Sequence, residues 1–188
     1  TGNHVPKDTV DLDFSVEKNI KNYSVASKKK FNDITVCLLD RPRHLKIISE
    51  LKRLNVKIKY ISDGDVSAAL LVSDKKYSVD IFMGIGGGPE GVIAAAALKK
   101  LNCKFQGRFL FNSDRDKSRA KMMGISDLNK KYEINEIVRG ESIFCATGIT
   151  SSDLMNGIVK DNDKYITETI VTYDKDFLEI IKKEVSFT

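Results

Sequence analysis

Residues 84–91, with the sequence GIGGGPEG, form a loop that is able to bind an anion. A short apolar run over residues 79–83 precedes this loop, and an alanine-rich run over residues 92–98 follows it. The order predicts a strand, a glycine loop and a helix, which together present backbone N–H groups to a negatively charged ligand. Glu90 complements the helix dipole but would repel a bare phosphate. We therefore predict that a metal ion lies between the loop and a phosphate.

Two further polar clusters follow earlier apolar runs of the chain. They are Arg41, Pro42 and Arg43, and Asp63, Gly64 and Asp65. Two arginines held by an intervening proline can clamp a phosphate through bidentate contacts. Two aspartates around a glycine can accept hydrogen bonds from sugar hydroxyls or hold a divalent cation. Taken singly, each cluster also fits an ordinary surface turn or helix cap.

The elements that carry these clusters alternate between strand and helix. Apolar, β-branched runs over residues 34–39, 56–61 and 79–83 predict three buried strands. Helical spacing over residues 45–54 and a short apolar run over 66–72 predict the helices between them. This alternation indicates βαβ units and a mainly parallel sheet flanked by helices. Because the carboxyl ends of parallel strands meet at one edge, the three clusters are expected to converge there.

The rest of the chain gives a weaker pattern. Residues 1–30 are polar, and we interpret them as a linker or arm before an α/β domain over residues 31–188. The further expected strands cover residues 105–111, 142–148 and 165–173, and the further expected helices cover residues 114–123, 128–138 and 177–185. Thr147 and Thr150 fall in a segment that we interpret as a turn at a strand end, with a place near a functional site as the alternative.

Composition limits the classes of partner. The 188 residues include 31 Lys and Arg against 26 Asp and Glu, a formal net charge of +5. Without a nucleic-acid-binding motif, this mild excess favours a solvated surface or an anionic small-molecule substrate over nucleic acid. No apolar run approaches the roughly 20 residues that span a bilayer, so no membrane partner is expected. The loop over residues 84–91 matches neither a dinucleotide-binding fingerprint nor a Walker A sequence.

The three cysteines, Cys37, Cys103 and Cys145, lie far apart and lack CxxC spacing. This spacing argues against a disulfide framework or a zinc site. We interpret them as buried thiols in a reducing compartment, and we expect a cytoplasmic protein. His44 is interpreted as a packing residue at a helix start rather than as a general base.

Several motifs in order along the chain resemble the class II, GlpX-type fructose-1,6-bisphosphatases. They are residues 40–44 (DRPRH), 63–66 (DGDV), 86–91 (GGGPEG), 106–108 (QGR) and 146–150 (ATGIT). The resemblance runs from about Ile34 to Tyr173. It implies a sugar-phosphatase-like α/β fold and hydrolysis of the 1-phosphate of fructose 1,6-bisphosphate with Mn²⁺ or Mg²⁺, a step of gluconeogenesis. It also implies a homo-oligomer.

The resemblance also assigns roles to individual residues. Those it assigns to substrate binding are Arg41, Pro42, Arg43, Asp63, Gly64, Asp65 and Gly87. Gly87 would contact the substrate through its backbone, and Glu90 would be a metal ligand, which agrees with the interpretation of the glycine loop.

Members of this family are much longer than 188 residues. The chain resembles only their C-terminal portion, so we expect it to be the C-terminal half of a larger two-part fold whose missing N-terminal half is a partner. That half supplies most of the acidic metal ligands in the family, so the catalytic residues are expected there and this chain alone is expected to be inactive. The chain begins at Thr1 rather than Met, which fits a processed product or a piece of a longer protein. Alternatives are a non-catalytic sugar-phosphate-binding module, or a phosphatase acting on sedoheptulose 1,7-bisphosphate or an inositol phosphate.

Overall fold

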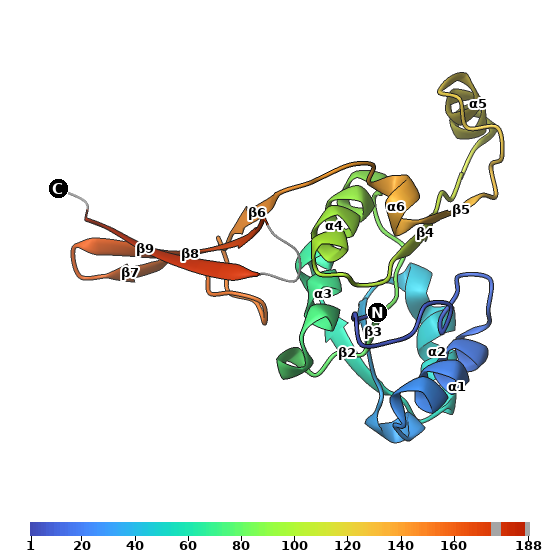
Figure 1. Ribbon diagram of the computed structural model, residues 1–188, viewed down its shortest axis with the longest axis horizontal. Helices are drawn as coiled ribbons and strands as arrows, with labels where there is room; N and C mark the ends of the chain where they lie inside the picture. The colour runs from blue at the N-terminus through green and yellow to red at the C-terminus, as the bar shows by residue number, and fades with distance from the viewer. Residues whose placement is uncertain (174–177, 187–188) are drawn as a thin grey trace.

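A parallel three-stranded sheet forms the centre of the structure, a computed structural model that describes residues 1–173 and 178–186 (Figure 1). Strand β1 (Thr35–Leu39) lies between β2 (Lys57–Ile61) and β3 (Ile81–Phe82). Thr35 pairs with Lys57 on one side, and Val36 pairs with Ile81 on the other. The parallel pairing places the carboxyl ends of all three strands at one edge of the sheet.

Helices cover both faces of this sheet. The connection from β1 to β2 contains η2 (Pro42–His44) and α2 (Leu45–Arg53). The connection from β2 to β3 contains α3 (Asp65–Leu70), η3 (Leu71–Ser73) and η4 (Lys75–Tyr77). Helix α4 (Gly88–Lys100) follows β3. Val36 and Leu38 of β1 pack in a core that includes Ile48 and Leu51 of α2. Cys37 faces the opposite way, into a core built largely from α3 and α4. Because successive strand residues point to opposite faces, β1 is buried on both sides, as expected for a central strand of an α/β structure.

The first thirty residues pack against the sheet, which corrects the expectation of a polar arm. Helix α1 (Val16–Ser27) begins at the N-cap Ser15, and η1 (Phe31–Asp33) leads into β1. Ile20 and Tyr23 are fully buried in the core beside Val36 and Leu38. Only a narrow stripe of this helix is apolar, so the polar composition of the segment did not indicate a helix that packs against the sheet.

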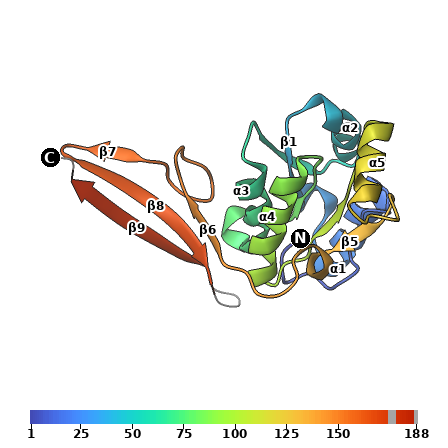
Figure 2. The same ribbon diagram turned by 90° about the horizontal axis from the view of Figure 1, so that it is seen from above.

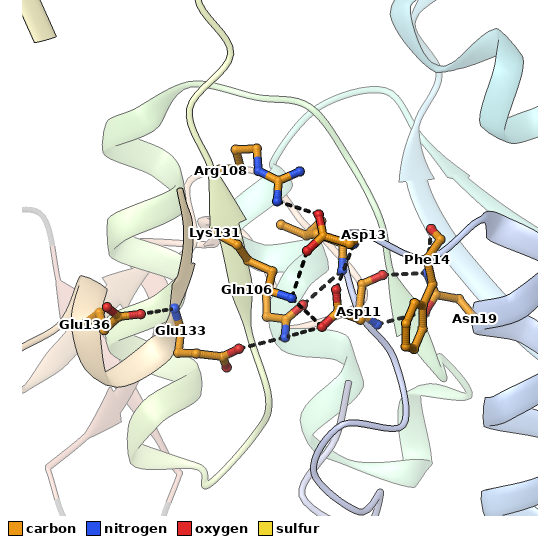
Figure 3. Close-up of polar contacts among 10 residues, drawn as sticks. Asp11, Asp13, Phe14, Asn19, Gln106, Arg108, Lys131, Glu133 and Glu136 are labelled. Atoms are coloured by element: carbon orange, nitrogen blue, oxygen red, sulfur yellow. Dashed lines mark hydrogen bonds and ion pairs between the residues drawn. The ribbon is translucent and has the colours of Figure 1, made fainter. Parts of the chain in front are cut away.

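A polar network fixes the loop that precedes α1, as Figure 3 shows. The ammonium group of Lys131 pairs with Asp11 at 2.5 Å and with Asp13 at 3.1 Å. The guanidinium of Arg108 reaches Asp13 at 2.5 Å, and Gln106 accepts a hydrogen bond from the N–H of Leu12 at 3.0 Å. The loop is thereby joined to residues 94 to 120 positions later in the chain.

Those later residues belong to a small antiparallel pair, β4 (Gln106–Arg108) and β5 (Lys131–Glu133), with α5 (Asp114–Met122) between them. The single helix expected over residues 128–138 is instead β5 followed by the one-turn helix α6 (Ile134–Ile137). A capping box between Glu133 and Glu136 starts that turn.

The C-terminal part is an antiparallel sheet that extends away from the helices (Figures 1 and 2). It contains β6 (Phe144–Thr147), β7 (Val159–Asp161), β8 (Lys164–Thr172) and β9 (Glu179–Ser186). Strand β8 pairs with all three others. Among the described strands, parallel pairing is confined to β1–β3, which corrects the expectation of a mainly parallel sheet. The helix expected over residues 177–185 is also wrong: its described part is β9, and Phe177 lies outside the described residues.

Within the described residues, no helix combines the length and the apolar character needed to cross a membrane. The three cysteines lie within the described residues and form no disulfide bond, and Cys37 and Cys103 are buried. Cys145 is exposed, which corrects the interpretation of all three as buried thiols.

Candidate functional site

The three polar clusters lie together at the carboxyl edge of the parallel sheet. Backbone hydrogen bonds join the strand ends. The N–H of Asp40 donates to the carbonyl of Ile61 at 2.9 Å, and the N–H of Met83 donates to the carbonyl of Cys37 at 3.0 Å. Beyond these bonds the chain leaves the sheet three times, through residues 40–44, 62–65 and 84–88. The edge is therefore a surface formed by three loops.

Arg41 and Arg43 connect these loops to each other. Nη2 of Arg41 donates to the carbonyl of Ser62 at 2.6 Å, and its Nη1 donates to the carbonyl of Asp40 at 3.1 Å. Nε of Arg43 donates to the carbonyl of Ile85 at 2.6 Å. Pro42, between them, begins η2, where its missing N–H is not needed.

The two arginines differ in what remains available to a ligand. Both terminal nitrogens of Arg41 already donate to backbone carbonyls, and its side chain is half-buried. Arg43 is exposed, and within the described residues its terminal nitrogens make no hydrogen bond. Its guanidinium is thus anchored through Nε while its fork stays open, the geometry that suits bidentate binding of a phosphate.

The Asp63–Asp65 turn places its two carboxylates differently. Gly64 has a φ of 80°, a left-handed conformation that favours glycine, and it caps α3. Asp63 is exposed and makes no hydrogen bond within the described part of the chain. Oδ1 of Asp65 accepts a hydrogen bond from the N–H of Val66 at 3.1 Å. Its Oδ2 lies 2.7 Å from the position that a Cβ on Gly86 would take, so Asp65 reaches the glycine loop.

The glycine loop ends at Gly87, the N-cap of α4. Gly86 and Gly87 are exposed, and none of the hydrogen bonds among the described residues uses their N–H groups. Glu90 stands in the first turn of α4, and its carboxylate folds back over Gly87, into the space that a Cβ there would fill. Free amides, a helix N-terminus and a carboxylate therefore lie at one point of the loop.

These residues supply oxygen donors that suit Mg²⁺ or Mn²⁺, but only part of a coordination shell. The carboxylate of Asp65 approaches Gly86, and the carboxylate of Glu90 approaches the adjacent Gly87. Within the described residues, no group of three or more His, Cys, Asp or Glu side chains is arranged to hold a metal. A hard divalent cation with about six oxygen ligands would take the remainder from phosphate, water or other protein groups.

A depression lies beside the Asp63–Gly64 turn. It has a volume of about 420 Å³ and is lined by residues of the 62–70 segment and of the 144–155 segment, including Thr147 and Thr150. The ion pair of Lys59 with Asp153, at 2.9 Å, ties the later segment to β2. The two segments are far apart in the chain, and packing brings them together.

The fold and this edge define a class of protein: an α/β protein whose parallel strand ends carry an arginine fork and an anion-binding glycine loop. A model of the family described as "Bacterial fructose-1,6-bisphosphatase, glpX-encoded" matches residues 1–184. The chain belongs to this family, which confirms the resemblance found in the sequence.

Curated relatives give the same family. The chain is 37% identical over 178 residues to a protein of Synechococcus sp. (strain JA-2-3B'a(2-13)) named D-fructose 1,6-bisphosphatase class 2/sedoheptulose 1,7-bisphosphatase, with 88% of this chain and 51% of that protein covered. It is 35% identical over 183 residues to Fructose-1,6-bisphosphatase 1 class 2 of Escherichia coli (strain K12), with 90% of this chain and 54% of that protein covered. The chain thus spans about half the length of these relatives.

Proposed function

We propose that this chain supplies the substrate-binding half of a divalent-metal-dependent sugar bisphosphatase. The reaction is hydrolysis of the 1-phosphate of fructose 1,6-bisphosphate, which gives fructose 6-phosphate and phosphate, a step of gluconeogenesis in the cytoplasm. The observation that carries the proposal is the hydrogen bond from Nε of Arg43 to Ile85, at 2.6 Å. It joins an open arginine fork to a glycine loop with free amides, so that two phosphate-binding groups share one sheet edge.

Each phosphate of the substrate has its own binding group in this proposal. Arg43 holds the distal 6-phosphate through its terminal nitrogens, while Arg41, tied to Ser62 and Asp40, contributes positive charge and keeps the loops together. Asp63 is exposed and unbonded within the described residues, so it is free to accept hydrogen bonds from sugar hydroxyls.

The reacting 1-phosphate lies against the amides of Gly86 and Gly87. Glu90 holds a Mg²⁺ or Mn²⁺ ion there, and Asp65 lies close enough to the loop to support it. Such an ion, when bound, activates water and stabilises the developing charge on phosphate. The residues of this chain bind and orient the phosphate, while further metal ligands and the catalytic groups come from the missing N-terminal half. A homo-oligomer remains a prediction.

Sedoheptulose 1,7-bisphosphate is a second candidate substrate. The name of the Synechococcus relative includes sedoheptulose 1,7-bisphosphatase, and the two sugars present the same phosphates with different chain lengths. A non-catalytic sugar-phosphate-binding module would use the same binding groups without turnover, and an inositol phosphate would present similar chemistry.

The binding role is tested by titrating the 188-residue chain with fructose 6-phosphate in a calorimeter. Arg43→Gln is expected to weaken binding by roughly 10- to 100-fold, the equivalent of a lost charge-assisted phosphate contact. Arg53→Gln is the matched control, because this substitution changes the net charge equally at a different place. Arg53, in α2, pairs with Glu17 of α1 at 2.7 Å. Equal weakening by both variants would show a general effect of charge and would contradict the assignment of Arg43.

The catalytic role is tested by phosphate release. The 188-residue chain is expected to release no phosphate from fructose 1,6-bisphosphate, whereas a protein that includes the missing half is expected to do so only with Mn²⁺ or Mg²⁺. In that longer protein, Glu90→Gln is expected to reduce turnover sharply and to weaken the metal dependence. Metal activation unchanged by this substitution would refute Glu90 as a ligand, and binding without turnover in the longer protein would favour the non-catalytic module.

A further inference from the structure

His44 is fully buried and makes two hydrogen bonds that join the end of β1 to the glycine loop. Its Nδ1 lies 2.7 Å from the carbonyl oxygen of Leu39, and its Nε2 lies 2.8 Å from the amide nitrogen of Ile85. A backbone N–H can only donate, so Nε2 must accept from Ile85 and carry no hydrogen. A carbonyl can only accept, so Nδ1 must carry the hydrogen. The two contacts together select the neutral Nδ1–H tautomer.

We propose that His44 is a positioning residue: in its Nδ1–H tautomer it fixes Ile85, and through Ile85 it sets where the glycine loop stands relative to Arg43. The catalytic consequence of this positioning rests on the proposed function. A role as general base does not fit, because the imidazole has no exposed surface and both of its nitrogens are engaged.

Arg43 and His44, which are consecutive in the chain, hold the two peptide groups of Ile85. Arg43 donates to its carbonyl at 2.6 Å, and His44 accepts from its N–H at 2.8 Å. The residues around Ile85 are Gly84, Gly86, Gly87 and Gly88, which restrain the backbone little. Within such a segment, one residue held at both ends determines the direction in which the following amides point.

The hydrogen bond from Ile85 to His44 controls the direction of the anion-binding amides, which packing alone would not do. The N–H groups of Gly86 and Gly87 make no hydrogen bond among the described residues and are open to an anion, and they follow Ile85 directly along the chain. Loss of the Nε2 acceptor leaves the Ile85 N–H without a partner and lets the loop turn. Loss of the Nδ1 donor affects Leu39 at the end of β1 and leaves the Ile85 bond in place.

Two variants separate these bonds. His44→Gln places a carbonyl oxygen near the position of Nε2 and keeps an acceptor for Ile85. His44→Asn places an amide NH₂ near the position of Nδ1 and keeps a donor for Leu39, but no atom reaches Ile85. Both replace imidazole by a carboxamide, so each is the matched control of the other.

The first measurement needs no variant. The nitrogen chemical shifts of His44 in the ¹⁵N-labelled 188-residue chain report the tautomer directly, and His4, the other histidine, is assigned by its own substitution. We expect Nδ1 protonated and Nε2 unprotonated. The reverse tautomer, or a mixture of the two, would overturn the proposal.

The second measurement is hydrogen exchange at the amide of Ile85. We expect protection in the wild type and in His44→Gln, and exchange roughly tenfold faster or more in His44→Asn, as the loss of one hydrogen bond implies. Equal exchange in the two variants would overturn the proposal, because it would mean that His44 contributes packing alone.

The third measurement is titration with inorganic phosphate, followed at the amides of Gly86 and Gly87. We expect a response in the wild type and in His44→Gln and a roughly tenfold weaker one in His44→Asn. If the wild type shows the expected tautomer and Ile85 protection but no response to phosphate, the positioning by His44 is upheld and the proposed function is the part that fails.

Discussion

Replacing Tyr23 with Phe removes one hydroxyl from a buried carboxylate site between α1 and the parallel sheet. The hydroxyl of Tyr23 donates to Oδ1 of Asp80 at 2.9 Å, and the Tyr23 ring is fully buried. Asp80 also accepts from Nζ of Lys29 at 2.7 Å and from the N–H of Thr35 at 2.9 Å. Asp80 directly precedes β3, the strand that leads into the glycine loop, so the site anchors the base of that strand to α1.

The size of the effect follows from these partners. Burial raises the pKa of Tyr23, and the charge of Asp80 and their hydrogen bond raise it further, so the hydroxyl remains a donor. A hydrogen bond to a charged group contributes about 1.5–3 kcal/mol to stability. Asp80 keeps two other donors in the variant, so we expect the lower end, about 1.5 kcal/mol. With a slope of about 2 kcal/mol per M, the urea midpoint falls by roughly 0.8 M.

Urea unfolding followed by circular dichroism measures this loss. Tyr132→Phe is the matched control, because the Tyr132 ring packs edge-on against Phe109 while its hydroxyl makes no hydrogen bond within the described residues. A double-mutant cycle with Asp80→Asn is expected to give a coupling above about 0.5 kcal/mol. The reasoning is refuted if Tyr23→Phe and Tyr132→Phe leave the midpoint equally unchanged.

Three further predictions concern other parts of the structure. Desolvation, the largest single influence, raises the pKa of Asp11. Hydrogen bonds from Lys131, from the N–H of Asp13 and from Gln106 together outweigh it and lower the pKa below the usual 3.8. The stability that Asp11 contributes is present above that value and is lost as the pH falls through the lowered pKa. Asp11→Asn should therefore flatten the decline of the urea midpoint below pH 3.8, and an undiminished decline would contradict the role of this pair. Burial raises the pKa of Cys37 to about 11, whereas Cys145 is exposed, so iodoacetamide at neutral pH should label Cys145 and spare Cys37. Mass spectrometry of the folded chain checks this, and equal labelling would refute it. A Cβ on Gly157 would lie 2.6–2.7 Å from backbone atoms of residues 149–151, so Gly157→Ala should lower stability by roughly 1–3 kcal/mol in urea unfolding. A midpoint equal to that of the wild type would show that this turn relaxes freely.

Local pattern was a good guide where each element is determined by its own residues. The β-branched run over residues 34–39 became β1, the helical spacing over residues 45–54 became α2, and the alanine-rich run after the glycine loop became α4. Each of these segments carries enough periodic apolar surface to specify its own secondary structure.

The two ends of the chain were not predictable in the same way. Helix α1 has few apolar positions, and its burial depends on a sheet that begins beyond it. Strand β9 pairs along β8, from Glu179 with Val171 to Ser186 with Lys164, and that pairing, rather than local preference, determines its conformation.

For the candidate site, the sequence by itself determined the chemistry: arginines, aspartates and a glycine loop with Glu90, each placed after a strand. Since parallel strands end at one edge, it also determined that these groups would lie near one another. Only the tertiary structure decided which atoms remain available. It left the terminal nitrogens of Arg43 open, engaged those of Arg41, and placed His44 between Leu39 and Ile85. Packing determines which residues far apart in the chain become hydrogen-bond partners, and residue type alone does not predict them.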